Sequence, residues 1–142
     1  MQKELAQRIP LVTRGWRQLA DAALAELRVS NSMAWCLIYL DRLGPEARQI
    51  DLAQAIGITQ PSTVRVLDQL ELGGLVEREQ HPDDKRSNRL ALTAAGKALL
   101  GKIDARLTEL RDELFAGIPD ADIANMLRVI DSVSARIAER RG

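Results

Sequence analysis

The chain has 142 residues, of which 46% are hydrophobic and 28% charged, and its formal net charge is zero. These values are typical of a globular domain that buries its own core, and they argue against a disordered chain. One cysteine and one histidine exclude an intramolecular disulfide and predict no metal site, and no apolar run approaches the roughly 18 residues of a membrane span.

The first 43 residues predict two helices. Apolar residues at three-and-four spacing indicate an amphipathic helix over 5–28, in which Pro10 marks a kink or a late start. Ser30 is the expected N-cap of a second helix that runs through Leu43. The stretch 33–40 is apolar nearly all round, so we expect this second helix to be buried. No secretory signal precedes these helices, so the cytoplasm is the expected location.

The segment that follows predicts a helix-turn-helix. A short helix from about residue 50 ends at Gly57, and a second helix begins at 59–61, where Pro61 stands in the first turn. Gly73 and Gly74 end that helix. Three aliphatic residues at helical spacing are expected to hold it on the core, namely Val64, Leu67 and Leu70.

A hairpin and two further helices complete the predicted fold. Strands over 75–80 and 88–92, joined by a charged loop, form a β-hairpin, or wing, and Thr93 caps a long helix. The last helix carries large aliphatics on two faces, which pairing into a homodimer would cover. The predicted fold class is therefore mainly α, a winged helix-turn-helix in one domain over 1–142. Residues 50–92 are the expected reading unit, and 1–30 and 93–142 are the expected dimerisation helices.

The start of the second helix of the helix-turn-helix has the chemistry of a DNA reader. A helix that enters the major groove presents its N-terminal residues to base edges, and here these are Gln60, Ser62, Thr63 and Arg65. Arginine can donate two parallel hydrogen bonds to guanine, or one charge-assisted bond to phosphate. Ordinary exposed helix starts have similar composition, so the pattern by itself leaves both interpretations open.

The wing loop supplies local positive charge. Lys85, Arg86 and Arg89 lie in or beside the hairpin loop, where an arginine can enter a minor groove. Asp84 is expected to orient the Arg86 guanidinium, which reduces the side-chain entropy lost on binding. A solvated charged turn is the alternative interpretation.

The stretch from Leu52 to Arg65, with Leu67–Leu70 and Gly74–Arg78 after it, resembles the MarR family of bacterial transcriptional regulators. The wing residues 82–86 and the Leu92–Thr93 pair are similar to that family's Asp-x-Arg wing motif and the start of its long helix. The amino-acid sequence of residues 60–70 is most similar to that of the SlyA-type branch.

This resemblance implies a homodimer that places two recognition helices in successive major grooves of a pseudo-palindromic operator in double-stranded DNA. Ser62, Thr63 and Arg65 would contact bases or phosphates, and Arg86 would be the wing arginine, with Asp84 as its partner. Lys85 stands where relatives often have arginine, and lysine lacks the planar fork of a guanidinium.

The resemblance also implies a small aromatic carboxylate or phenolic effector, bound among the first, second and fifth helices. The residues that would form such a site are Arg14, Arg17, Ser32, Trp35 and Tyr39. Aromatic residues at this spacing also serve as core, and the arginines as surface ion pairs. Cys36 lies among apolar neighbours, so we expect a buried thiol with a raised pKa rather than a redox sensor.

The sequence therefore predicts a sequence-specific DNA-binding regulator, a repressor that a small aromatic or anionic effector relieves. A winged-helix module that binds proteins rather than DNA is the alternative. An enzyme is not expected, because the chain has no Gly-rich phosphate loop, no metal-ligand cluster and no nucleophile with a paired base. We expect no cofactor.

Overall fold

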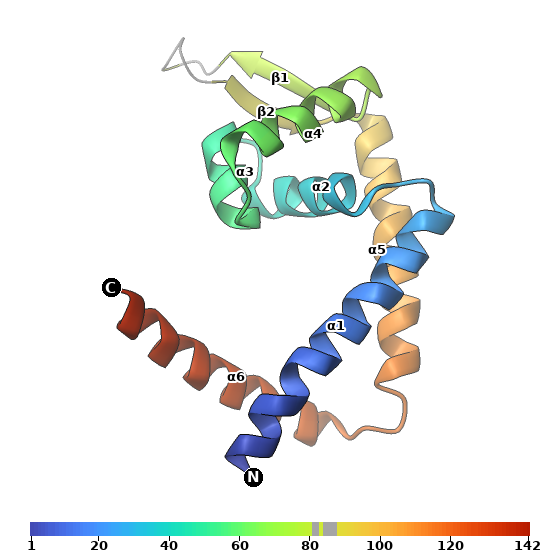
Figure 1. The fold of residues 1–142 in the computed structure, drawn as a ribbon. Coiled ribbons are helices and arrows are strands. Elements are labelled where there is room, and N and C mark those ends of the chain that lie inside the picture. The colour runs from blue at the N-terminus through green and yellow to red at the C-terminus, as the bar shows by residue number, and fades with distance from the viewer. Residues whose placement is uncertain (81–82, 84–87) are drawn as a thin grey trace. The chain divides into compact units, whose positions relative to one another are not determined.

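The computed structural model of the chain describes residues 1–80, 83 and 88–142. Within these residues the chain forms six helices and one two-stranded antiparallel sheet (Figure 1). In chain order the elements are α1 (Gln2–Glu26), α2 (Asn31–Leu43), α3 (Gln49–Ile56), α4 (Gln60–Leu72), β1 (Val76–Gln80), β2 (Asn88–Leu92), α5 (Ala94–Leu114) and α6 (Asp120–Arg141). The predicted fold class, mainly α with a small two-stranded wing, is confirmed.

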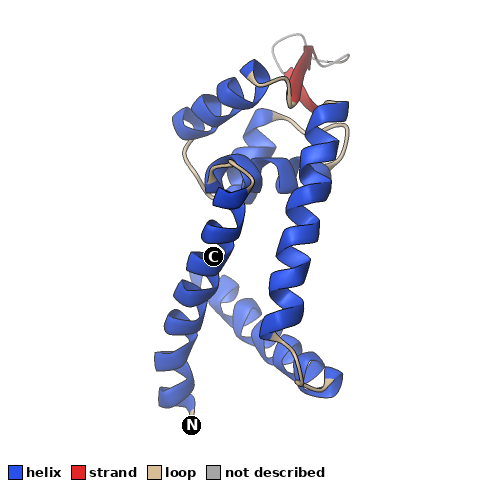
Figure 2. Ribbon diagram, turned by 90° about the vertical axis from the view of Figure 1, so that its right-hand side faces the viewer, coloured by secondary structure: helices blue, strands red, loops and turns tan. Residues whose placement is uncertain are grey.

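The chain divides into two compact units, Met1–Leu110 and Arg111–Gly142. The first unit holds α1 to β2 and most of α5, and the second holds the last residues of α5 and all of α6. Figure 2 shows the two strands at one end of the first unit, with helices and loops making up the rest of what is drawn there.

Helix α1 begins at Gln2 and continues through Pro10, so the expected late start is wrong. Proline has no backbone N–H, and it leaves the carbonyl of Ala6 without its helical donor. This part of α1 is exposed, so water can supply the missing hydrogen bond. The interruption therefore lies where the helix tolerates it.

Helix α2 forms as predicted. The Ser30 hydroxyl accepts a hydrogen bond from the Met33 backbone N–H at 3.2 Å, and Gly44 ends the helix with φ of 81°. The buried residues of α2 are Ala34, Cys36, Leu37, Ile38 and Leu40. Ser30 and Gly44 thus fix the two ends of α2, and its apolar side chains place it in the core of the first unit.

The core of the first unit is aliphatic, and every element of that unit except β1 contributes a large buried residue to the following set: Leu24, Leu37, Leu52, Leu67, Leu70, Leu90 and Ile103. Val76 adds a buried side chain from β1. Each side chain of this size stabilises the fold by roughly 1.5–3 kcal/mol relative to leaving it in water. The helix-turn-helix and the wing are therefore packed on one shared core.

The wing is attached on both sides. Strand β1 pairs with β2 so that Val76 lies opposite Leu92 and Gln80 opposite Asn88. On its other edge, β2 receives the loop before α3, because the Leu90 backbone N–H donates to the carbonyl of Ala47 at 2.8 Å. Both edges of β2 are thus hydrogen-bonded to other parts of the unit.

The base of the wing is fixed to the start of α5. The Thr93 hydroxyl donates to the carbonyl of Gly74 at 2.6 Å and accepts from the Gly96 N–H at 3.0 Å, which confirms Thr93 as a cap. A Cβ at Gly96 would overlap the carbonyl oxygen of Leu75, so only glycine fits this close approach. Thr93 and Gly96 together hold the wing and α5 in one arrangement.

Candidate nucleic-acid interface

The turn between α3 and α4 has the geometry that the sequence predicts. Gly57 adopts the left-handed conformation, with φ of 77° and ψ of 29°, which glycine reaches without steric cost. Thr59 then caps α4, because its hydroxyl oxygen accepts from the Ser62 N–H at 3.4 Å and its hydroxyl lies 3.0 Å from the Ser62 hydroxyl. The first turn of α4 is therefore ordered before any ligand arrives.

The burial of two adjacent residues of α4, Thr63 and Val64, is the reverse of what the sequence predicts. Thr63 is completely buried, and its hydroxyl donates to the carbonyl of Thr59 at 2.9 Å. Its expected contact with DNA does not agree with this burial. Val64, expected in the core, is 37% exposed, and Val66 is buried instead. The outward face of the first turns of α4 therefore carries Gln60, Ser62, Val64 and Arg65.

Arg65 is exposed on α4, and it has no hydrogen bond or ion pair with any residue that the structure describes. Its guanidinium therefore keeps five N–H donors for an external partner. This availability distinguishes Arg65 from the arginines of the wing strands.

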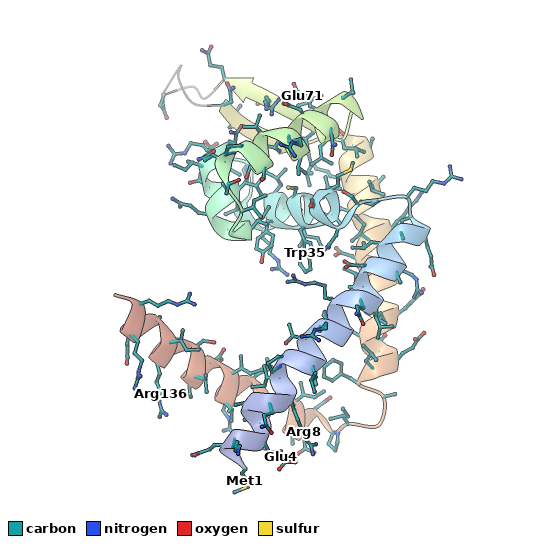
Figure 3. All side chains as sticks on the ribbon, viewed as in Figure 1. Met1, Glu4, Arg8, Trp35, Glu71 and Arg136 are labelled. Carbon is teal, nitrogen blue, oxygen red and sulfur yellow. The ribbon has the colours of Figure 1, made fainter. Side chains whose placement is uncertain are left out.

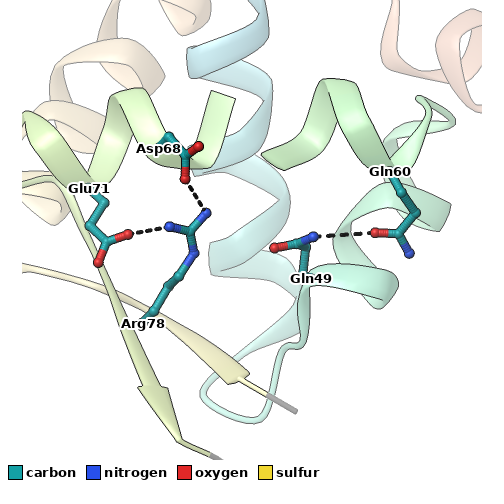
Figure 4. Close-up of polar contacts among 5 residues, drawn as sticks. All are labelled: Gln49, Gln60, Asp68, Glu71 and Arg78. Atoms are coloured by element: carbon teal, nitrogen blue, oxygen red, sulfur yellow. Dashed lines mark hydrogen bonds and ion pairs between the residues drawn. The ribbon is translucent and has the colours of Figure 1, made fainter. Parts of the chain in front are cut away.

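Arg78, on β1, joins the wing to α4, and sequence reasoning did not select it. Its guanidinium donates to Asp68 at 2.8 Å and to Glu71, both on the exposed side of α4 (Figure 4). The Arg78 side chain is only 20% exposed. The two ion pairs offset one of the two negative charges of these carboxylates, which would otherwise repel phosphate, and they fix β1 against α4.

Arg89, on β2, is not available in the way that the sequence suggests. Its guanidinium pairs with Glu79 at 2.9 Å and with Glu46 at 3.5 Å. Two carboxylates of the same chain thus offset its charge, and its contact with DNA stays a prediction. Its role in this structure is to tie β2 to β1 and to the loop before α3.

The other wing residues, Asp84, Lys85 and Arg86, lie outside the described residues. Their expected contact with a minor groove stays a prediction.

Gln49 is a second residue that the sequence analysis missed. It is the first residue of α3, and its amide nitrogen Nε2 donates to Oε1 of Gln60, the first residue of α4, at 3.4 Å (Figure 4). A polar residue at a helix start carries no signal of its own in a sequence, and only the angle between α3 and α4 brings these two amides together.

The residues expected to hold an effector are partly brought together. Trp35 and Tyr39 are half-buried on α2, with ring centroids 6.1 Å apart, and Trp35 lies on the side of α2 away from the wing (Figure 3). The cation over the Tyr39 ring is Arg42, with its guanidinium carbon 5.4 Å from the ring centroid. Three of the expected residues are exposed, namely Arg14, Arg17 and Ser32. Their ligand role stays a prediction.

Cys36 is completely buried in α2. Burial raises the pKa of its thiol to about 11, because an apolar environment disfavours the thiolate. The predicted buried thiol with a raised pKa is therefore confirmed.

The described part of the chain holds no cluster of three metal-ligating His, Cys, Asp or Glu side chains, and none of its helices combines the length and apolarity that a membrane crossing requires.

Comparison with known proteins agrees with this geometry. The MarR family model matches residues 30–87, which run from the cap of α2 into the wing. The solved structure of the transcriptional regulator PA3341 is 28% identical, covers 95% of this chain and 98% of that chain, and superposes with a TM-score of 0.85. The MarR family transcription regulator SP03579 is 21% identical over 96% of this chain and 90% of that chain, with a TM-score of 0.87.

A DNA complex is also among the similar structures. A MarR mutant from E. coli complexed with operator DNA is 22% identical over 92% of this chain and 93% of that chain, with a TM-score of 0.79. At this identity the likeness shows the fold, a winged helix-turn-helix with long flanking helices.

Proposed function

We propose that the chain is a MarR-family transcriptional regulator of the SlyA-type branch that binds double-stranded DNA as a homodimer. The observation that carries this proposal is the exposed first turn of α4, where Arg65 has no ion pair with any described residue. The match of residues 30–87 to the family model and the likeness to a MarR–operator complex support it.

Each protomer would insert α4 into a major groove, with Ser62 and Arg65 as contacts to bases or phosphate. The wing would follow the flanking minor groove, with Arg86 entering it, Asp84 orienting Arg86, and Lys85 beside them. Two-fold pairing of protomers matches a pseudo-palindromic operator, because the symmetry of the protein is repeated in the DNA. A chain without net charge requires such local placement of cations.

The operator contact is tested with Arg65→Ala in the full chain. Operator affinity should fall at least tenfold, corresponding to about 1–3 kcal/mol for one bidentate base contact. Fluorescence anisotropy over a salt series measures this loss together with the counterion slope. Lys102→Ala is the control, because it removes one positive charge from an exposed position of α5. Unchanged binding by the Arg65 variant would contradict the proposed contact, and an absence of DNA binding by the wild type would favour the protein-interaction alternative.

In this proposal the protein is a cytoplasmic repressor that a small aromatic carboxylate or phenol releases from DNA. A ligand shifts the equilibrium only by its difference in affinity between DNA-compatible and incompatible arrangements of the two reading units. Titrating the preformed DNA complex with benzoate and with phenol tests this step. Complexes that persist at millimolar concentrations of both compounds would contradict it.

A further inference from the structure

The contact between Gln49 and Gln60 joins two helix starts that lie 11 residues apart in the sequence. Gln60 is exposed at the beginning of α4, and Gln49 is half-buried at the beginning of α3 (Figure 4). Neither amide is needed to complete the core or to cap a helix, because Thr59 caps α4 and Asp51 accepts the Arg48 N–H at the start of α3. The pair is thus a contact on the surface that the proposed function assigns to DNA.

In the structure the hydrogen bond restrains the Gln60 amide in one orientation. An amide has an oxygen with two lone pairs and a nitrogen with two hydrogens, and rotation of the group by 180° exchanges them. Because Gln49 donates from Nε2, the Gln60 oxygen faces Gln49. One lone pair of that oxygen and both Nε2 hydrogens of Gln60 are left for an external partner.

This set of groups complements adenine. In the major groove adenine offers a donor at N6 beside an acceptor at N7, and a glutamine amide binds both at once. A flexible glutamine loses rotamer freedom when it binds, and a hydrogen bond formed in advance reduces that loss. Gln49 therefore affects base recognition through Gln60, without contacting the base itself.

Val64 extends the same edge of α4. It lies four residues after Gln60, one helical turn further along, and it is 37% exposed. An aliphatic side chain in the major groove contacts the C5-methyl group of thymine. The two side chains together fit an A·T-containing step.

We propose that Gln60 reads an adenine in each operator half-site and that Gln49 is the positioning residue that holds the Gln60 amide in the reading orientation. This inference rests on the proposed function, because it requires α4 to lie in a major groove. In this proposal Gln60 forms the contact with adenine, and Gln49 strengthens the preference for adenine by orienting the Gln60 amide.

The experiment selects binding sites from random double-stranded DNA with the full-length wild-type chain and its variants. Wild type should enrich an adenine at one position of each half-site. Gln60→Ala and Gln49→Ala should each reduce the preference for that adenine about fivefold or more, within the range expected for a bidentate base contact. Gln49→Lys keeps a donor for the Gln60 oxygen and should retain the preference. Gln54→Ala, at an exposed position of α3, is the matched control.

A second measurement separates reading from folding. Replacing the selected adenine with 7-deazaadenine removes N7, so wild type should lose affinity severalfold, whereas Gln60→Ala and Gln49→Ala should lose little more than they have already lost. The slope of affinity with salt should be the same for wild type, Gln60→Ala and Gln49→Ala, because none of these changes adds or removes a charge.

The outcomes distinguish the two proposals. If wild type enriches no sequence, the proposed function fails and this inference fails with it. If wild type enriches a site but Gln60→Ala keeps the adenine preference, only the adenine contact is overturned. If Gln60→Ala loses the preference and Gln49→Ala keeps it, the positioning role of Gln49 is overturned.

Discussion

Helices α4 and α6 both carry aliphatic side chains at helical spacing, but only α4 buries them within the described chain. Val66, Leu67 and Leu70 of α4 are buried, whereas no residue of α6 is. The large aliphatics of α6 are each about half exposed, namely Met126, Leu127, Val129, Ile130, Val133 and Ile137. Exposed apolar surface on this scale is characteristic of an interface. The contrast teaches that α4 is positioned by its own chain, whereas α6 needs another surface, which the proposed homodimer supplies.

The largest expected effect comes from charging the apolar face of α6. Ile130→Glu combined with Val133→Glu should weaken the proposed dimer on the order of 100-fold or more, because each buried aliphatic contributes roughly 1.5–3 kcal/mol and a two-fold interface contains each position twice. Sedimentation equilibrium over a range of concentrations measures the shift.

Leu72→Glu is the matched control for that variant, because Leu72 is 92% exposed at the end of α4. It should leave the oligomeric state unchanged. A doubly substituted α6 that still dimerises like the wild type would place the interface elsewhere.

The next prediction concerns the stability of the first unit, where α5 packs closely against the base of the wing. Gly96→Ala should lower the free energy of unfolding by about 2 kcal/mol or more, because the new Cβ would overlap the Leu75 carbonyl and α5 must move away from the wing. Gly101→Ala, in the same helix with open space around it, should raise that free energy by about 0.5–1 kcal/mol. Urea denaturation measures both, and equal effects at the two glycines would contradict the close approach.

The last effect appears only in alkali and is negligible at neutral pH. The Cys36 thiol has a pKa of about 11 in the folded chain and an ordinary value near 9 when unfolded. Below about pH 8 both states hold the proton and stability is unaffected. As the pH rises from 9 through 11 the unfolded state loses its proton first, so stability should fall by up to about 2 kcal/mol. Urea denaturation at pH 7 to 10.5 should show this fall in the wild type and a smaller one in Cys36→Ala. Identical pH profiles would contradict a buried neutral thiol.

The sequence was most informative where local chemistry decides the structure. Ser30 and Thr93 each cap a helix at the expected position, the second helix of the helix-turn-helix begins within the expected 59–61, and Gly57 takes a left-handed conformation in the turn between the two helices. These features depend on a few neighbouring residues, so a short pattern is sufficient to predict them. The same reasoning located the exposed first turn of α4.

The sequence was less informative where contacts between distant segments determine which side chains are buried or paired. Val64 was expected in the core from its spacing with Leu67 and Leu70. The buried stripe of α4 instead passes through Thr63, whose hydroxyl donates to the carbonyl of Thr59. Arg89 looked available because Glu46 is far from it in the chain. The exact tilt of α3 against α4, which joins Gln49 to Gln60, has no counterpart in a periodic pattern.

Because Thr93 and Gly96 attach the base of the wing to the start of α5, a tilt of this helix displaces the wing. From Ala94 to Leu110 this helix is roughly 24 Å long, at 1.5 Å per residue. If the end at Leu110 is held, a tilt of about 5° carries the wing base sideways by roughly 2 Å over that length. Because the wing is hydrogen-bonded to α5 at Thr93, to the loop before α3 at Ala47 and to α4 through Arg78, such a displacement carries the hairpin together with the helix-turn-helix. The inclination of α5 therefore sets where the whole reading unit lies relative to the end of this helix at Leu110.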